Sequence, residues 1–152
     1  MNYHNIAHED MLNGEGLRVV LWVSGCNHNC KGCHNPETHD INSGIPFDEK
    51  AKEELFEYLN KEYIDGITFS GGDPLHPNNR ETVTQLAKIV KNKFKKTVWL
   101  YTGYKYEEIK DLIIMKYIDV LIDDEFKIEL KDEKLNWRGS SNQRIIRLDN
   151  DE

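Results

Sequence analysis

The chain has 152 residues, of which 38% are hydrophobic and 31% charged, and this balance predicts a single globular domain over residues 1–152. Its 27 acidic and 20 basic residues give a net charge of -7, and the basic residues are spread along the chain, so nucleic acid is not an expected partner. The chain begins without a basic, apolar leader and its longest uninterrupted apolar run covers only residues 19–23, so we expect a cytoplasmic protein with no signal peptide and no membrane-spanning helix.

Short apolar runs alternate with amphipathic segments along the chain. The apolar runs predict strands, and their continuous apolar character suits strands that are buried on both faces. Between them, apolar residues recur at every third or fourth position, which predicts helices. In chain order the predicted elements are a strand at residues 17–24, a helix at 48–61 with Asp48 as its N-cap, a strand at 66–70, a helix at 79–94, a strand at 97–102, a helix at 105–116, a strand at 118–122 and a less regular strand at 143–148.

This alternation predicts an α/β fold with mainly parallel strands and right-handed crossovers. A closed eight-stranded barrel takes about 250 residues, more than this chain has, so we expect an open, partial (β/α) barrel. Ligands of such sheets bind at the carboxyl ends of the strands. Three polar segments follow predicted strands and are candidates for the site: the loop that begins at Gly25, residues 71–74 and residues 102–104.

Three cysteines, Cys26, Cys30 and Cys33, follow the first predicted strand with the spacing C-x3-C-x2-C. An odd number of cysteines in so short a segment is a poor disulfide framework and indicates metal binding. Three thiolates from one loop can hold three corners of a 4Fe-4S cluster. The sequence has no fourth cysteine, so one iron of the cluster would be left open.

Zinc is the alternative metal, because a Cys3His set is a recognised tetrahedral site and His28 or His34 could supply the fourth ligand. The chain would then be a zinc-binding interaction module without catalysis. Structural zinc sites more often join two short half-sites, and the second half-site is missing here. The spacing therefore favours the iron–sulfur cluster.

The cysteine spacing after the first strand resembles the radical S-adenosylmethionine superfamily. In that superfamily the methionine part of S-adenosylmethionine chelates the open iron, and the second strand ends in a Gly-Gly-Glu-like motif that binds the methionine amino group. Here residues 70–74 are SGGDP, with Asp73 in place of glutamate, and Gly32 stands where the superfamily usually has an aromatic residue. The resemblance implies that S-adenosylmethionine lies against Gly71, Gly72 and Asp73 at its methionine end and against the backbone of Gly32, Cys33 and His34 at its adenosyl part.

Several segments, including GLRVVLWVSGCNHNCKGCHNPETHD, SGGDPLHP and WRGSSNQRII, resemble a short subfamily of that superfamily, the enzymes that activate anaerobic ribonucleoside-triphosphate reductases. The resemblance implies an oxidoreductase that reductively cleaves S-adenosylmethionine to a 5′-deoxyadenosyl radical. That radical would take a hydrogen atom from a glycine of the large reductase subunit, with a flavodoxin- or ferredoxin-type protein as electron donor. The nearest alternative is a radical S-adenosylmethionine enzyme that acts on another glycyl-radical enzyme or on a small molecule.

Other polar positions have simpler interpretations. Arg18 is interpreted as a surface residue, and Asp123 with Asp124 as a solvated turn after the fourth strand, where the subfamily resemblance leads us to expect Asp-Gly. Residues 101–104 could place polar groups near a ribose, although an aromatic residue at a strand end more often packs. We hypothesise that residues 137–143 (WRGSSNQ), with Trp137 and Arg138, form part of a contact surface for the reductase.

Overall fold

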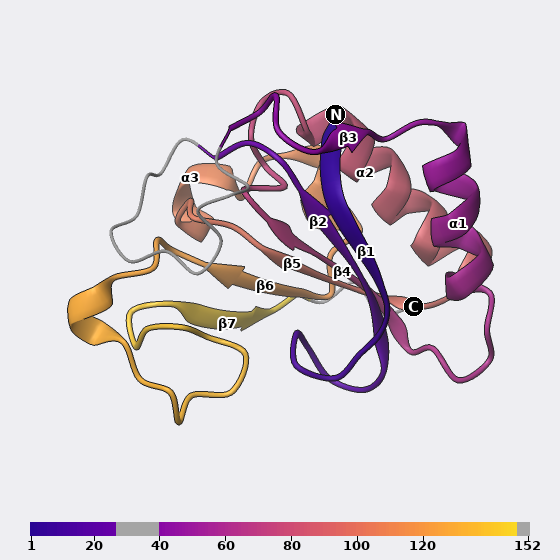
Figure 1. The fold of residues 1–152 in the computed structure, drawn as a ribbon. Helices are drawn as coiled ribbons and strands as arrows, with labels where there is room; N and C mark the ends of the chain where they lie inside the picture. Colours follow the sequence, from indigo (N-terminus) through magenta and orange to yellow (C-terminus); the bar gives the residue numbers. More distant parts are fainter. Residues whose placement is uncertain (27–39, 149–152) are drawn as a thin grey trace.

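The computed structural model describes residues 1–26 and 40–148, which contain one seven-stranded sheet (Figure 1). The strands β2, β4, β5 and β6 are parallel to one another, whereas β1 pairs antiparallel with β2, β3 with β1, and β7 with β6. Across the sheet the order is β3 (Ile45–Pro46), β1 (Asn2–Asp10), β2 (Arg18–Val23), β4 (Gly66–Gly71), β5 (Thr97–Tyr101), β6 (Val120–Asp123) and β7 (Arg144–Arg147). In the described part of the chain β3 and β7 are the two edges and do not pair with each other, so the sheet is open and is not a closed barrel.

Local features mark the start of the first helix and the end of the second. Helix α1 (Glu49–Leu59) starts after Asp48, whose Oδ1 accepts a hydrogen bond from the backbone N–H of Ala51 at 3.0 Å. Helix α2 (Arg80–Ile89) continues as a π-helical segment, Val90–Phe94, and ends at Lys95 in the left-handed conformation with φ 57°. The short helix α3 (Tyr106–Ile109) follows β5.

The sheet separates two apolar clusters, and β5 shows how. Val98 and Leu100 belong to the larger cluster, to which α1 and α2 contribute their buried residues on one side of the sheet (Figure 1). Trp99, which lies between them in sequence, belongs to a smaller cluster with Val120 and Ile122. Because successive side chains of a strand point to opposite faces, a strand that is covered on both sides is apolar at every position.

Most of the predicted elements are confirmed. The five predicted strands are found with bounds that differ by at most two residues, and the first two helices begin within a residue of their predicted start. The helix predicted at residues 105–116 is wrong in its middle, because Leu112 is extended with ψ 141° between α3 and a 3-10 turn at Ile113–Lys116. This break leaves Ile113 66% exposed and buries Ile114 and Met115 instead.

The sequence does not predict β1 or β3, whereas the predicted arrangement of mainly parallel strands is confirmed by β2, β4, β5 and β6. In β1 only Tyr3 and Ile6 are buried, and its pairing with β2 is interrupted by register shifts, so the strand lacks a clear alternation of apolar and polar residues. β3 has only two residues. The strand β7 returns antiparallel to β6.

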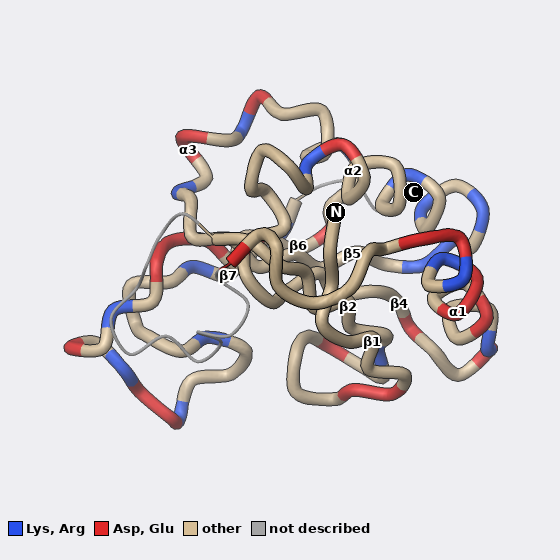
Figure 2. The backbone as a smooth tube through the Cα atoms, turned by 45° about the horizontal axis from the view of Figure 1, so that its top comes forward, with Lys and Arg blue, Asp and Glu red and all other residues tan. Residues whose placement is uncertain are grey.

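Charged residues of both signs are interspersed along the backbone (Figure 2). Acidic and basic residues are mixed along α1 and along the loop between β6 and β7, and the sequence has no long tract of one sign. Among the residues that the structure describes, no helix combines the length and the apolar character needed to cross a membrane.

Candidate active site

The four parallel strands all end on the same side of the sheet, called here the carboxyl end of the sheet. The residues predicted from the sequence follow two of these strand ends. Cys26 comes three residues after the end of β2 and is partly buried. Gly71 ends β4, and Gly71 and Gly72 are partly exposed whereas Asp73 is 1% exposed. The other predicted residues, Cys30, Gly32, Cys33 and His34, lie outside the described residues, so their roles stay predictions.

Backbone hydrogen bonds join the segment before Cys26 to the turn after β4. The N–H of Gly72 donates to the carbonyl of Val23 at 2.8 Å, and the N–H of Asp73 donates to the carbonyl of Gly25 at 2.6 Å. Gly71 has φ 107°, and a Cβ there would lie 2.4 Å from the carbonyl oxygen of Val23, so only glycine fits this close approach. The structure therefore brings the cysteine loop and the SGGDP turn together through the main chain.

The carboxylate of Asp73 binds the end of the next strand. The hydroxyl of Thr102 donates to its two oxygens at 2.9 and 3.0 Å, and the N–H of Gly103 donates to Oδ2 at 3.0 Å. The N–H of Leu75 donates to Oδ1 at 2.9 Å. Hydrogen bonds to an ionised carboxylate are stronger than neutral ones, so Asp73 fastens the end of β5 to the end of β4. Its predicted contact with S-adenosylmethionine stays a prediction.

Asn79 is a further buried polar residue at the carboxyl end of the sheet, and its role could not be recognised from the sequence. It is 0% exposed, and its Nδ2 donates to the carbonyl oxygens of Ser24 at 2.8 Å and Asp73 at 3.0 Å. Its Oδ1 is buried and has no hydrogen-bond partner among the described residues. An asparagine just before a helix resembles an ordinary N-cap, so the sequence carries no signal for this arrangement.

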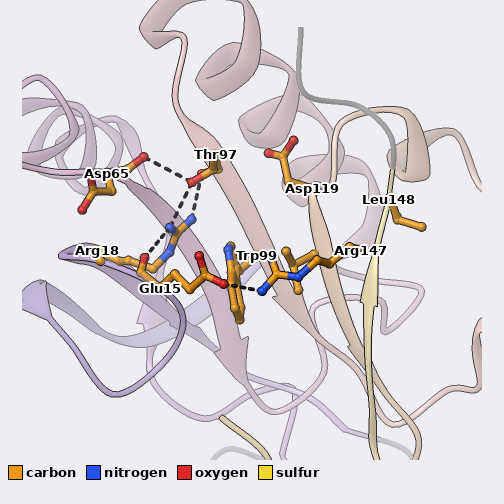
Figure 3. Close-up of a pocket in the computed structure, with 10 residues that line it drawn as sticks. Glu15, Arg18, Asp65, Thr97, Trp99, Asp119, Arg147 and Leu148 are labelled. Carbon is orange, nitrogen blue, oxygen red and sulfur yellow. Dashed lines mark hydrogen bonds and ion pairs between the residues drawn. The ribbon is translucent and has the colours of Figure 1, made fainter. Parts of the chain in front are cut away.

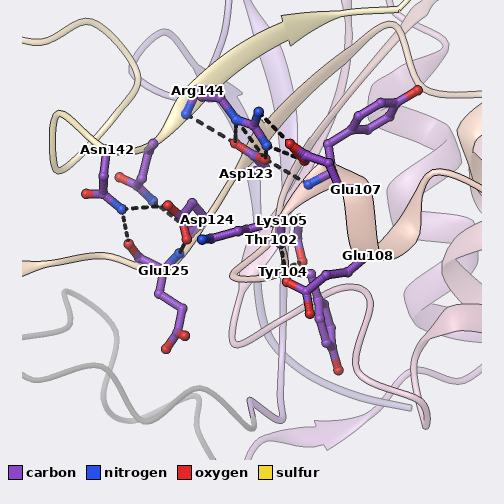
Figure 4. Close-up of polar contacts among 12 residues, drawn as sticks. Thr102, Tyr104, Lys105, Glu107, Glu108, Asp123, Asp124, Glu125, Asn142 and Arg144 are labelled. Atoms are coloured by element: carbon purple, nitrogen blue, oxygen red, sulfur yellow. Dashed lines mark hydrogen bonds and ion pairs between the residues drawn. The ribbon is translucent and has the colours of Figure 1, made fainter.

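The end of β6 carries an ion pair between the buried Asp123 and the exposed Arg144 (Figure 4). Asp123 is 0% exposed, Nε of Arg144 donates to both of its carboxylate oxygens at 3.1 Å, and the N–H of Tyr106 donates to Oδ2 at 2.8 Å. Arg144 also bonds the carboxylate of Glu107 at 2.7 and 2.8 Å. These bonds raise the pKa of Arg144 above its ordinary value, and the Arg144 hydrogen bond holds the pKa of Glu107 at about 2. The prediction of a solvated turn is therefore wrong for Asp123.

Asp124 ties the loop after β5 to the segment before β7. Its φ is 76°, a left-handed conformation that glycine adopts easily, which explains why Asp-Gly is expected here. Its N–H donates to the carbonyl of Tyr104 at 2.9 Å, and its Oδ2 accepts from Nδ2 of Asn142 at 3.0 Å (Figure 4). Nε2 of Gln143 donates to its carbonyl oxygen at 3.2 Å. Asp124 therefore has structural partners in residues far along the chain.

Trp137 is partly buried and packs against the smaller apolar cluster. Its ring meets Trp99 edge to face, with ring centroids 5.0 Å apart, in the smaller apolar cluster. Nη1 of Arg138 donates to the carbonyl of Gln143 at 3.1 Å. Both residues thus contribute to the fold, and a contact of residues 137–143 with the reductase stays a prediction.

Arg18 lies at the opposite end of the sheet, where the parallel strands begin (Figure 3). It is 1% exposed, and burial lowers its pKa to about 10, so its interpretation as a surface residue is wrong. Its five N–H groups donate at 2.9–3.0 Å to the hydroxyls of Thr68 and Thr97 and to the carbonyls of Glu15, Ile67 and Thr97. Arg18 borders a cavity of about 460 Å³ that Trp99 and Arg147 also line. Neither Cys26 nor the SGGDP turn lines this cavity, so it is separate from the candidate site.

Comparison with known proteins shows the family to which the chain belongs. Residues 12–146 match the family described as the 4Fe-4S single cluster domain. The chain is 49% identical to the anaerobic ribonucleoside-triphosphate reductase-activating protein of Enterobacteria phage T4, over 95% of this chain and 93% of the phage protein. Proteins of the same name from Escherichia coli (strain K12) and Pasteurella multocida (strain Pm70) are 42% and 44% identical, over 97% of this chain and 99% and 98% of theirs. The chain therefore belongs to the family of anaerobic ribonucleoside-triphosphate reductase-activating proteins, and most of its length matches the 4Fe-4S single cluster domain.

Proposed function

We propose that the chain activates an anaerobic ribonucleoside-triphosphate reductase by forming a glycyl radical on its large subunit. The observation that carries the proposal is the match over 95% of the chain to a protein named as an activator of that reductase. A different glycyl-radical enzyme or a small molecule as substrate has no comparable support. The zinc module is disfavoured because the matching family is a 4Fe-4S domain.

Cys26, Cys30 and Cys33 would hold a 4Fe-4S cluster, for which thiolates are the usual ligands. Cys26 fits this role, because it is a partly buried thiol at the carboxyl end of a parallel strand, where α/β sheets bind their ligands. When bound and reduced, the cluster supplies one electron for the cleavage of S-adenosylmethionine into methionine and a 5′-deoxyadenosyl radical, which takes a hydrogen atom from the partner's glycine.

The chain's own residues would bind and orient S-adenosylmethionine. Gly71 and Gly72 are partly exposed and let the main chain approach the methionine end, where a side chain would clash. The negative charge of Asp73 would favour the methionine ammonium group, and its bonds to Thr102 and Gly103 hold the neighbouring strand end in place. The adenosyl part would lie against the backbone of Gly32, Cys33 and His34.

The open sheet suits a macromolecular substrate. A glycine on a loop of the partner must come within a few ångströms of the reacting carbon, and the unpaired edges β3 and β7 leave the sheet open for such an approach. The proposal includes a flavodoxin- or ferredoxin-type electron donor. It also places the reaction in the cytoplasm, where a reducing environment keeps thiolate ligands available.

Anaerobic reconstitution with iron and sulfide tests the proposal. The dithionite-reduced protein should give a 4Fe-4S electron paramagnetic resonance spectrum that changes when S-adenosylmethionine is added, and a glycyl radical should appear when the large reductase subunit is present. The variants Cys26→Ala, Cys30→Ala and Cys33→Ala should each lose the cluster, whereas His28→Ala and His34→Ala should keep it. A colourless protein that holds stoichiometric zinc, and loses it in a histidine variant, would overturn the proposal.

A further inference from the structure

We propose that Asn79 is a positioning residue of the active site and sets the placement of Cys26 relative to the turn at residues 71–73. This inference rests on the proposed function, because it concerns how the chain holds the cluster ligand and the methionine-binding turn in one arrangement. Asn79 itself lies at the start of α2 and belongs to neither motif.

The carbonyls of the segment before Cys26 accept hydrogen bonds from donors that all come from the region between β4 and α2, whereas the N–H and the hydroxyl of Ser24 donate to the carbonyls of Asn2 and Ser43. The three consecutive carbonyls of Val23, Ser24 and Gly25 accept hydrogen bonds from the N–H of Gly72, from Nδ2 of Asn79 and from the N–H of Asp73. The outer two bonds are made by the main chain and come with any sequence that adopts this fold. The middle bond depends on the side chain of Asn79, so a substitution at Asn79 removes it and leaves the outer two donors in place.

The same amide group binds both motifs. The second hydrogen of Nδ2 goes to the carbonyl of Asp73 at 3.0 Å, within the SGGDP turn, while the first goes to Ser24, two residues before Cys26. Both acceptors are carbonyl oxygens, which fixes the amide with its nitrogen toward them and its Oδ1 away. Asn79 thus links the segment that leads into the first cysteine to the turn predicted to bind methionine.

The unpaired Oδ1 shows that this orientation has a cost. A buried amide oxygen without a donor lowers stability, and an asparagine at a helix start ordinarily accepts a hydrogen bond from the helix through that oxygen. Asn79 makes no such cap bond, and within residues 1–26 and 40–148 its buried Oδ1 has no hydrogen-bond partner. Natural proteins break such local rules chiefly at functional sites, so the arrangement points to positioning and not to helix capping.

Loss of the amide should therefore weaken the binding of S-adenosylmethionine more than it harms the fold. The variants Asn79→Ala and Asn79→Ser remove the double link, and serine retains a small residue that is favourable at a helix start. Thr68→Ala is the matched control. Thr68 lies on β4, far from the carboxyl end of the sheet, and is also 0% exposed. Its hydroxyl donates to the carbonyl of Asn13 at 2.7 Å and accepts from Nε of Arg18 at 2.9 Å.

The experiment measures the thermal midpoint by circular dichroism, the iron content, and the concentration of S-adenosylmethionine that changes the electron paramagnetic resonance spectrum of the reduced protein. We expect all three variants to lower the midpoint, and the Asn79 variants alone to need about tenfold more S-adenosylmethionine, which corresponds to about 1.4 kcal/mol. This readout does not depend on turnover with the reductase.

Three results would overturn the inference while leaving the proposed function intact. These are wild-type behaviour of Asn79→Ala toward S-adenosylmethionine, an equal change in Thr68→Ala, and failure of both Asn79 variants to fold where Thr68→Ala folds, which would make Asn79 purely structural. A wild-type protein that gives no 4Fe-4S spectrum would overturn the proposed function and, with it, this inference.

Discussion

Arg18→Lys keeps the buried positive charge where the parallel strands begin but cannot reproduce the hydrogen bonds of the guanidinium. Arg18 uses five N–H groups to bind oxygen atoms of Glu15, Ile67, Thr68 and Thr97, which draws together the starts of β2, β4 and β5 (Figure 3). A lysine ammonium group has three donors on one nitrogen. At least two of the five bonds must therefore be lost.

The expected loss of stability follows from those two bonds. Because the charge stays buried in both proteins, its desolvation is similar and largely cancels in the comparison. Each buried acceptor left without a donor costs about 1–3 kcal/mol, so two of them lower the free energy of unfolding by about 3 kcal/mol. In a protein of this size, that corresponds to a fall of about 6–12 °C in the thermal midpoint.

Arg147→Lys is the matched control. Arg147 lines the same cavity as Arg18, but its side chain is 59% exposed and pairs with Glu15 at the surface. An exposed ion pair contributes at most about 1 kcal/mol, so this variant should unfold close to the wild type. Urea unfolding of the anaerobically purified proteins, followed by far-ultraviolet circular dichroism, gives both values. If the two variants differ by less than about 1 kcal/mol, the buried bonds of Arg18 do not stabilise the sheet as reasoned here.

Other predictions concern the carboxyl end of β6 and the segment before β7. Asp124→Gly should be more stable than Asp124→Ala by about 1 kcal/mol in urea unfolding, since φ is 76° and both variants lose the Asn142 bond; equal stabilities would contradict the assigned strain. The pKa of Glu107 is lowered to about 2, so its bond to Arg144 stabilises the fold above the ordinary carboxyl pKa and is lost as the pH falls toward 2. Glu107→Gln should therefore show a shallower fall of the urea midpoint between pH 5 and pH 2 than the wild type, and an unchanged slope would count against this bond. Trp137→Ala should cost about 2 kcal/mol because it removes the contact with Trp99, with iron content unchanged; a wild-type midpoint combined with weaker binding of the reductase would instead assign Trp137 to the interface.

The parallel strands and α1 could be predicted because their signals are local. A continuous apolar run such as VVLWV indicates a strand that is covered on both faces, and Asp48 before an amphipathic segment indicates a helix start. β1 could not be predicted in this way, because it is mostly polar and is recognised only by its pairing with β2. The helix at residues 105–116 failed for the opposite reason: its apolar period is helical, but tertiary packing buries Ile114 and Met115 by breaking it.

For the site, the sequence by itself predicted the chemistry, because three clustered thiols and a Gly-Gly-Asp turn each follow a predicted strand, and the carboxyl ends of parallel strands lie together. Only the tertiary structure decided which polar side chains hold together the two ends of the parallel strands, Asn79 and Asp123 at the carboxyl ends and Arg18 at the opposite ends. Arg18, Asp123 and Asn79 have the residue types of surface or capping positions, yet all three are buried. Their partners lie far along the chain, 79 residues away for the Arg18–Thr97 bonds and 55 for the Asn79–Ser24 bond. A buried polar group is stable only where such partners meet it, and folding, not local sequence, brings them together.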